Sequence, residues 1–181
     1  MAKFYDALDE KLNKFIAKQQ MYFVATAAAD GRVNLSPKGY DSLRVLGPNR
    51  VVWLNMTGSG NETAAHLQEV NRMTIMFCAV EGAPLILRLY GTAQTIHPRD
   101  EAWGELSALF PNDGPGNRQI FDMTIESVQT SCGFGVPFFD FVGERDTLLK
   151  DAAHKGTDGI KDYWEKKNVV SIDGLPTGLF E

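Results

Sequence analysis

The sequence has few of the residues that build a disulfide framework or a metal centre. Its 181 residues include two cysteines, Cys78 and Cys132, and three histidines, His66, His97 and His154, all far apart in the chain. Small secreted scaffolds need more cysteines, and the usual zinc sites need closely spaced Cys and His pairs. No such motif is present, although a site assembled from distant residues stays open.

An excess of positive charge is also missing. Eighteen lysines and arginines face 23 acidic residues, so the net charge is -5, and no basic run offsets it locally. Nucleic acid and anionic membranes are therefore not expected partners. No stretch has the length of a membrane span, and the first 15 residues alternate acids, bases and aromatics, unlike a signal peptide. We expect a cytoplasmic protein.

Side-chain catalysts are equally scarce. The chain has no Gly-x-Ser-x-Gly nucleophile motif, no P-loop and no complete dinucleotide fingerprint. Cys132 has no nearby histidine to activate it and is expected to be a small core residue beside a turn. His66 is expected to be a surface or capping histidine. Such a chain fits a protein in which a cofactor does the chemistry.

What the sequence does contain is a pattern of short strands. We expect one domain over 1–181, with an amphipathic N-terminal helix over 1–19, a core over 20–137 and a helical C-terminal extension and tail over 138–181. About six antiparallel strands, with further helices over 63–70, 98–109 and 143–168, predict a mainly β (α+β) fold, a small β-barrel with peripheral helices.

Two details of the strand pattern bear on assembly and curvature. Residues 72–80 are apolar on both faces, so one face would line the barrel and the other would lie under a helix or a second subunit; we therefore expect a homodimer. The alternation that begins at Gln119 slips at Ser127-Val128, which predicts a β-bulge.

The segment TGSGNETAAHL (57–67) has two interpretations. Ser59 and Glu62 form a capping box, which is the commoner reason for such a sequence at a helix start. Alternatively, Gly58 and Gly60 allow a tight turn whose free N–H groups converge on a phosphate. The segment alone favours the cap.

Several segments together resemble the pyridoxamine 5'-phosphate oxidase-like family of FMN-binding split barrels. They are FVATAAADGRVNLSPKG, VVWLNMTGSGNETAAHL, RMTIMFCAV, LRLYGTA and SCGFGVP, spread over residues 20–137. The resemblance implies a split-barrel homodimer with two FMN sites at the subunit interface, each lined by both chains. It also makes phosphate binding the favoured interpretation of residues 57–67.

The resemblance implies a set of cofactor-binding residues in three segments: Asn34, Leu35, Ser36 and Lys38; Trp53, Leu54 and Asn55; Gly60, Asn61 and Thr63. Two of them have ordinary alternatives. Lys38 could be a solvated loop charge or a cation that stabilises a reduced flavin, and Trp53 is more readily explained by core packing than by flavin stacking. No catalytic side chain and no metal ligand is assigned.

Two departures from the family pattern limit the functional assignment. The basic side chains that hold phosphate in the oxidases proper are replaced by Asn61, Glu62 and Thr63, and residues 143–181 have no recognisable counterpart of their pyridoxal phosphate-binding segment. We therefore expect an FMN-dependent oxidoreductase acting on a small molecule other than vitamin B6. The alternatives are a non-catalytic flavin-binding or sensing protein and a deazaflavin-dependent reductase.

Overall fold

A computed structural model describes residues 2–111 and 114–180 of the chain. The strands are β1 (Lys3–Tyr5), β2 (Tyr22–Thr26), β3 (Asn34–Lys38), β4 (Leu43–Gly47), β5 (Arg50–Met56), β6 (Arg72–Cys78), β7 (Ile86–Ile96) and β8 (Asn117–Ser131). The helices are α1 (Glu10–Ile16), α2 (Glu62–Glu69), α3 (Trp103–Ser107) and α4 (Thr147–Lys167). The expected mixture of antiparallel strands with a few helices is confirmed, with eight strands in the described part rather than about six.

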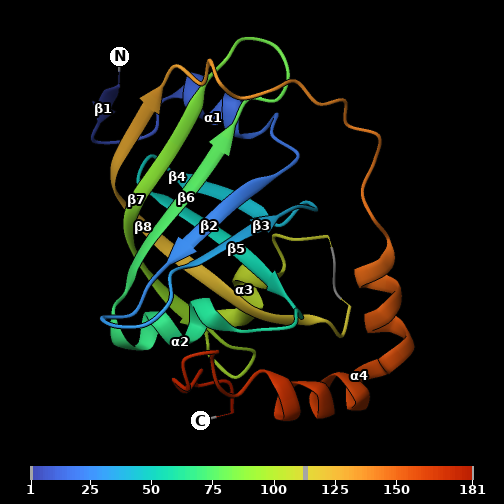
Figure 1. Cartoon of the computed structure of the whole chain (residues 1–181). Coiled ribbons are helices and arrows are strands. Elements are labelled where there is room, and N and C mark those ends of the chain that lie inside the picture. The colour runs from blue at the N-terminus through green and yellow to red at the C-terminus, as the bar shows by residue number, and fades with distance from the viewer. Residues whose placement is uncertain (1, 112–113, 181) are drawn as a thin grey trace.

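All eight strands belong to one strongly twisted antiparallel sheet (Figure 1). Its order is β3-β2-β6-β7-β8-β5-β4, and β1 pairs with the far end of β8. β3 and β4 are therefore the two edges, yet only four residues separate them in the chain. Such a connection spans at most roughly 18 Å. The two edges must lie close together without pairing, which gives a curled but open sheet.

The sheet encloses the main hydrophobic core on its inner face. Alternate residues of the central strands point inward, as the buried Met73, Ile75 and Phe77 of β6 illustrate. Leu12 and Ile16 of α1 close this core at one end. A second cluster covers the outer face of β5 and β8 under α3; its members are Val52, Leu54, Ile96, Leu106, Phe110 and Ile120.

A bulge bends the longest strand where it changes partners. β8 pairs with β5 through Thr124 and with β1 from Val128, while β7 pairs with it from Ile120 to Ser131. Tyr90 pairs with Ser127 and Gly91 with Ile125, so Glu126 is the additional residue. The predicted bulge is thus present, one residue before the predicted position. A Cβ at Gly91 would lie 1.9 Å from the carbonyl oxygen of Thr124, so this crossing needs glycine.

Several expected elements differ at their ends. The predicted helix over 1–19 is wrong in its first part: residues 3–5 form β1, Phe4 is exposed, and α1 begins after Asp9, whose carboxylate accepts a hydrogen bond from the N–H of Leu12 at 2.7 Å. The helix predicted over 98–109 shortens to Trp103–Ser107. Cys132 is exposed, so its assignment to the core is also wrong. Residues 111–116 are rich in proline and glycine, which predicts a loop, and this segment falls partly outside the described residues.

A long connection links β8 to α4, and we call residues 132–142 the aromatic arm. It departs from the top of the sheet and runs to α4 at the side of the molecule (Figure 1). The exposed apolar side chains of the arm are Phe134, Phe138, Phe139, Phe141 and Val142. α4 then bends at Gly156, whose φ of 63° is left-handed, and the chain ends beside α2.

No helix within the described ranges is both long and apolar enough to cross a membrane.

Candidate functional site

A cavity of about 700 Å³ lies between strands β3 and β5, the start of α2 and the segment after α4, residues 168–180, which we call the C-terminal segment. This volume is within the range of sites for small molecules and cofactors. The residues that line it are Arg32, Val33, Asn34, Leu35, Ser36, Lys38, Trp53, Asn55, Met56, Gly58, Ser59, Gly60, Asn61, Glu62, Thr63, His66, Arg118, Lys167, Val170, Ser171 and Ile172.

The beginning of α2 faces this cavity without a side-chain cap. The N-cap is Asn61 rather than Ser59, and it makes no capping hydrogen bond. Glu62, the other half of the predicted capping box, accepts instead from the N–H of Ile172 at 3.1 Å. The capping-box interpretation is therefore wrong. Because the first N–H groups of a helix have no partner inside it, they remain for solvent or a ligand.

Arg118 supplies a buried positive charge beside this helix start. Its side chain is 2% exposed; it donates to Oδ1 of Asn168 at 2.6 Å and to the carbonyl oxygen of Gly60 at 3.1 Å. Burial lowers the pKa of Arg118 to about 10, so the guanidinium is still charged at neutral pH. No carboxylate of the described chain pairs with it, although buried arginines are normally paired.

Lys38 adds a second cation to the same cavity. Its ammonium group lies 4.8 Å from the centre of the Trp53 ring, a cation–π contact. Burial, and then the charge of Arg118, lower the pKa of Lys38 to about 8. Lys38 likewise forms no ion pair with a carboxylate in the ranges that the structure describes. Two neighbouring like charges without a counter-charge favour the binding of an anion in the cavity.

Three buried polar atoms of the lining have no protein partner: Oδ1 of Asn61, Nε2 of His66 and Nε of Arg118. Buried polar atoms are normally hydrogen-bonded, so these are available to a ligand. The Thr63 hydroxyl accepts from Nδ2 of Asn34 at 3.2 Å, which leaves its own proton to donate. The cavity thus offers a guanidinium and a hydroxyl as donors for an anion, and an amide oxygen as acceptor for a hydroxyl.

Nine of the ten predicted cofactor-binding residues line this one cavity. The exception is Leu54, whose side chain points to the outer face of β5 and packs in the cluster under α3. Trp53 packs against Phe121 with ring centres 4.7 Å apart, as core packing predicts, and it also borders the cavity. Lys38 is half-buried in the cavity and is not a solvated loop charge.

Some lining residues were not predicted from the sequence. His66 is buried, with Nδ1 3.0 Å from Oγ1 of Thr26, so its assignment to the surface is wrong. Arg118 was missed because a charged residue at the start of a strand ordinarily faces water. In the structure Arg118 is buried and donates to Asn168, which follows α4 some 50 residues later in the chain.

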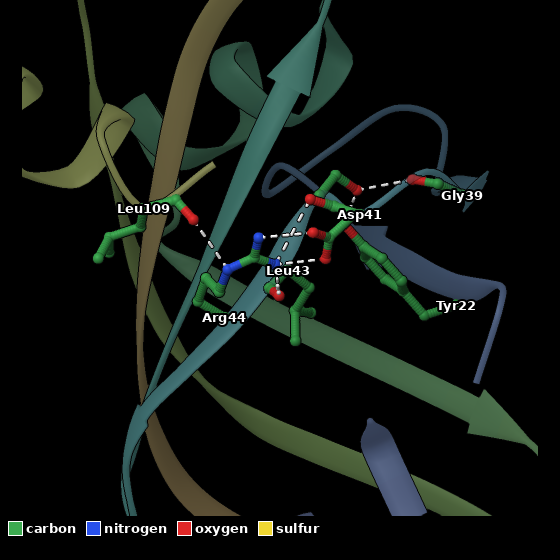
Figure 2. Close-up of polar contacts among 7 residues, drawn as sticks. Tyr22, Gly39, Asp41, Leu43, Arg44 and Leu109 are labelled. Carbon is green, nitrogen blue, oxygen red and sulfur yellow. Dashed lines mark hydrogen bonds and ion pairs between the residues drawn. The ribbon is translucent and has the colours of Figure 1, made fainter. Parts of the chain in front are cut away.

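A second cavity of about 700 Å³ lies between α1 and β4, but its polar groups are largely satisfied within the protein. The hydroxyls of Tyr22 and Ser42 lie 2.8 Å apart, and Ser42 donates to the Gly39 carbonyl at 2.7 Å. Arg44 donates to the carboxylate of Asp41 at 2.5 and 2.7 Å and to the carbonyl of Leu109 (Figure 2). Asn13 has the only orphan side-chain atom among its described lining residues. This cavity therefore offers fewer unpaired polar atoms to a ligand than the cavity beside α2 does.

Comparison with known sequences identifies the family. The family model described as pyridoxamine 5'-phosphate oxidase matches residues 8–132, which is more than half of the chain. The chain belongs to this family. A family member from Aspergillus flavus, the pyridoxamine 5'-phosphate oxidase family protein ustO, is 35% identical over 193 aligned positions that cover 97% of this chain and 78% of the relative.

Solved structures agree on the fold of this pyridoxamine 5'-phosphate oxidase family member. HupZ of Group A Streptococcus superposes with a TM-score of 0.53 at 20% identity, covering 67% of this chain and 91% of the other. A Lactobacillus delbrueckii protein, provisionally described as a pyridoxamine 5'-phosphate oxidase, gives 0.53 at 21% identity, covering 68% and 94%. The open, curled sheet is therefore the split barrel that the sequence predicted.

The family match also divides the site. Residues of β3, β5, α2 and Arg118 lie inside the matched range, whereas Lys167 and the C-terminal residues Val170, Ser171 and Ile172 lie beyond it. The described residues contain no group of three or more His, Cys, Asp and Glu side chains that could hold a metal ion. The cavity between β3, β5, α2 and the C-terminal segment is the candidate site.

Proposed function

We propose that this chain is an FMN-binding flavoprotein that transfers two electrons to or from a small organic substrate. The observation that supports it is the pair of cations without carboxylate partners, Arg118 and Lys38, in a cavity at the uncapped start of α2. A phosphate ester satisfies both this charge and the free N–H groups. The family assignment points to the same class of cofactor.

The residues present fit FMN. Arg118, the hydroxyl of Thr63 and the first turn of α2 would hold the phosphate, Asn61 and His66 would meet the ribityl hydroxyls, and Asn34 to Ser36 with Lys38 would border the ring system. When bound, the isoalloxazine ring supplies hydride acceptance or donation at N5. The protein's own part is to orient the ring, exclude water and place the Lys38 charge nearby, which would stabilise an anionic reduced ring.

We further propose that the active form is a homodimer. The aromatic arm exposes 82% of Phe134 and 99% of Val142, and the outer face of β6 leaves Met76 and Cys78 half-exposed in the single chain. Monomers rarely expose apolar side chains in such a contiguous run.

The substrate would be a small molecule that enters beside β3, where Val33 and Leu35 are exposed.

The identity of the cofactor can be tested directly. We expect the purified protein to be yellow and to release FMN, identified by mass spectrometry, and the flavin-free protein to rebind FMN in preference to riboflavin or FAD. Release of a deazaflavin would replace FMN by that cofactor. Failure of the flavin-free protein to bind any flavin would contradict the proposal.

Catalysis needs a separate measurement. We expect NADH or NADPH to bleach the bound flavin under anaerobic conditions, and a small organic acceptor to restore its absorption. If no donor bleaches the flavin while dithionite does, the protein is a flavin binder and not an enzyme.

A further inference from the structure

Asn168 is the central polar residue of the wall formed by the C-terminal segment. It directly follows the last residue of α4, its side chain is 0% exposed, and its backbone N–H closes the helix on the carbonyl of Trp164 at 2.8 Å. Its backbone carbonyl accepts from Nδ2 of Asn61 at 3.3 Å and from the hydroxyl of Thr177 at 2.7 Å.

The side-chain amide of Asn168 joins the two halves of the candidate phosphate site. Oδ1 accepts from Arg118 at 2.6 Å, and Nδ2 donates to the carbonyl of Gly58 at 3.2 Å. A guanidinium can only donate and a carbonyl can only accept, so these two partners fix which end of the amide is oxygen. One residue therefore holds both the cation and the glycine turn.

The choice of a neutral amide has an electrostatic consequence. An aspartate at this position would also accept from Arg118, but it would neutralise the guanidinium as a buried ion pair. Asparagine orients Arg118 and leaves its charge uncompensated.

The C-terminal segment that carries Asn168 is bound to the barrel by polar contacts. Examples are the ion pair between Asp173 and Arg32 and the hydrogen bond from Gln68 to the carbonyl of Pro176 at 3.0 Å.

We propose that Asn168 is a positioning residue that presents an uncompensated Arg118 to the phosphate of the cofactor, and so makes the site select a phosphorylated flavin over riboflavin. The inference rests on the proposed function for the identity of the ligand. It assigns a role to the C-terminal segment, which lies outside residues 8–132, the range matched by the family model.

Two substitutions separate charge from position. Asn168→Asp keeps an acceptor for Arg118 but cancels its charge, whereas Asn168→Ala keeps the charge but loses the orienting bond. We expect FMN affinity to fall on the order of 100-fold in Asn168→Asp and about tenfold in Asn168→Ala, with riboflavin affinity nearly unchanged in both. The ratio of FMN affinity to riboflavin affinity is measured by quenching of flavin fluorescence, with the flavin-free protein in the oligomeric state in which it is purified.

Thr177→Val is the matched control. It removes a buried hydrogen bond to the same residue, the one to the Asn168 carbonyl, without touching Arg118. We expect it to lower the melting temperature but to leave the FMN-to-riboflavin ratio unaltered. If Asn168→Asp is no worse than Asn168→Ala, or if all three variants lose FMN and riboflavin in parallel, Asn168 has only a structural role and the inference is wrong.

Inorganic phosphate and pyrophosphate make the test independent of flavin. We expect either anion to raise the melting temperature of the flavin-free wild-type protein and to have no effect on Asn168→Asp. Wild-type protein that responds to the anions but binds no FMN would overturn the proposed function and the selection of a flavin, and would retain only the role of Asn168 in presenting Arg118 to an anion. Wild-type protein that responds to neither anion, or an Asn168→Asp variant that responds like wild type, would overturn the inference.

Discussion

At the scale of single residues, the site is defined by charges that the protein does not neutralise. Three other arginines pair with carboxylates: Arg44 with Asp41, Arg50 with Asp122 and Arg32 with Asp173. Arg118 and Lys38 line the same cavity, and the partners of both in the described chain are neutral: an amide, a carbonyl and an aromatic ring. Burying a charge without a counter-charge costs free energy, so a bound anion is the expected compensation.

Removal of the Arg118 charge should weaken FMN binding specifically. We expect Arg118→Met to lower FMN affinity roughly 10- to 100-fold, because a charge-assisted hydrogen bond to phosphate is lost, and to change riboflavin affinity little. Equilibrium titration with both flavins gives the ratio. Arg88→Met is the control, since Arg88 donates to Ser131 on β8 and does not line the cavity. Equal losses for both flavins in Arg118→Met would argue against phosphate at this position.

The pKa of Lys38 predicts a proton uptake on binding. In the ligand-free protein this pKa is about 8, and an anion favours the charged form and raises it. We therefore expect FMN binding at pH ~8.5 to take up a fraction of a proton, and affinity to fall by up to about tenfold per pH unit above that pKa. Calorimetry in buffers of different ionisation enthalpy measures the uptake. Lys38→Met should abolish it; an unchanged uptake in that variant would assign the proton to another group.

The same shift sets the pH dependence of ligand-free stability. The folded-state pKa of Lys38, about 8, lies below its unfolded value of 10.5, so the unfolded chain binds more protons between these two values. This residue therefore contributes a rise in the free energy of unfolding as pH increases from about 8 towards 10.5.

At the scale of elements, the strands of the barrel core were predictable, whereas β1 and the ends of the helices were not. β4 and β5 are joined by Pro48 and Asn49, as these turn residues predict. Asp30-Gly31 is typical of a tight hairpin, and β2 and β3 do pair around it, but residues 27–33 form a longer connection. The start of the first helix was misplaced because Phe4 fits the helical apolar spacing, yet its backbone pairs with Gln129 of β8. A pairing with a strand more than a hundred residues away leaves no mark in local periodicity.

The close approach of Gly91 on β7 to the bulge in β8 leads to a prediction about stability. Gly91→Ala places a methyl group against the Thr124 carbonyl, so the ladder must open locally, and we expect a loss of at least about 3 kcal/mol in the free energy of unfolding. Gly104→Ala is the control: nothing lies within 4 Å of its Cβ position in α3, and alanine should be neutral or stabilising by up to about 1 kcal/mol. Chemical denaturation measures both. Equal stabilities would contradict the close approach.

At the scale of the whole molecule, the exposed aromatic arm predicts association. We expect light scattering at micromolar concentration to give twice the 20.0 kDa mass of one chain. Phe138→Asp should shift the population towards monomer without changing the circular dichroism spectrum, because the side chain is exposed in the single chain. A wild-type monomer at that concentration would refute the dimer.

The site also shows what a sequence alone can give at this scale. Nine of its residues lie in three segments that a family likeness identifies, between Asn34 and Thr63. Arg118 and Asn168 come from distant elements that meet only in the folded protein. The end of α4 packs against the barrel there, where Nε1 of Trp164 donates to the hydroxyl of Thr57 at 2.8 Å. Such a meeting depends on tertiary packing, which neither composition nor spacing encodes.

The return of α4 sets an order of events during synthesis. The cavity draws residues from Arg32 to Ile172, so a ribosome must translate past the latter before the wall can dock. A nascent barrel that has emerged only through β8 would hold Arg118 without its amide partner. We therefore expect loading with the flavin to follow synthesis of the segment that contains Asn168 to Ile172.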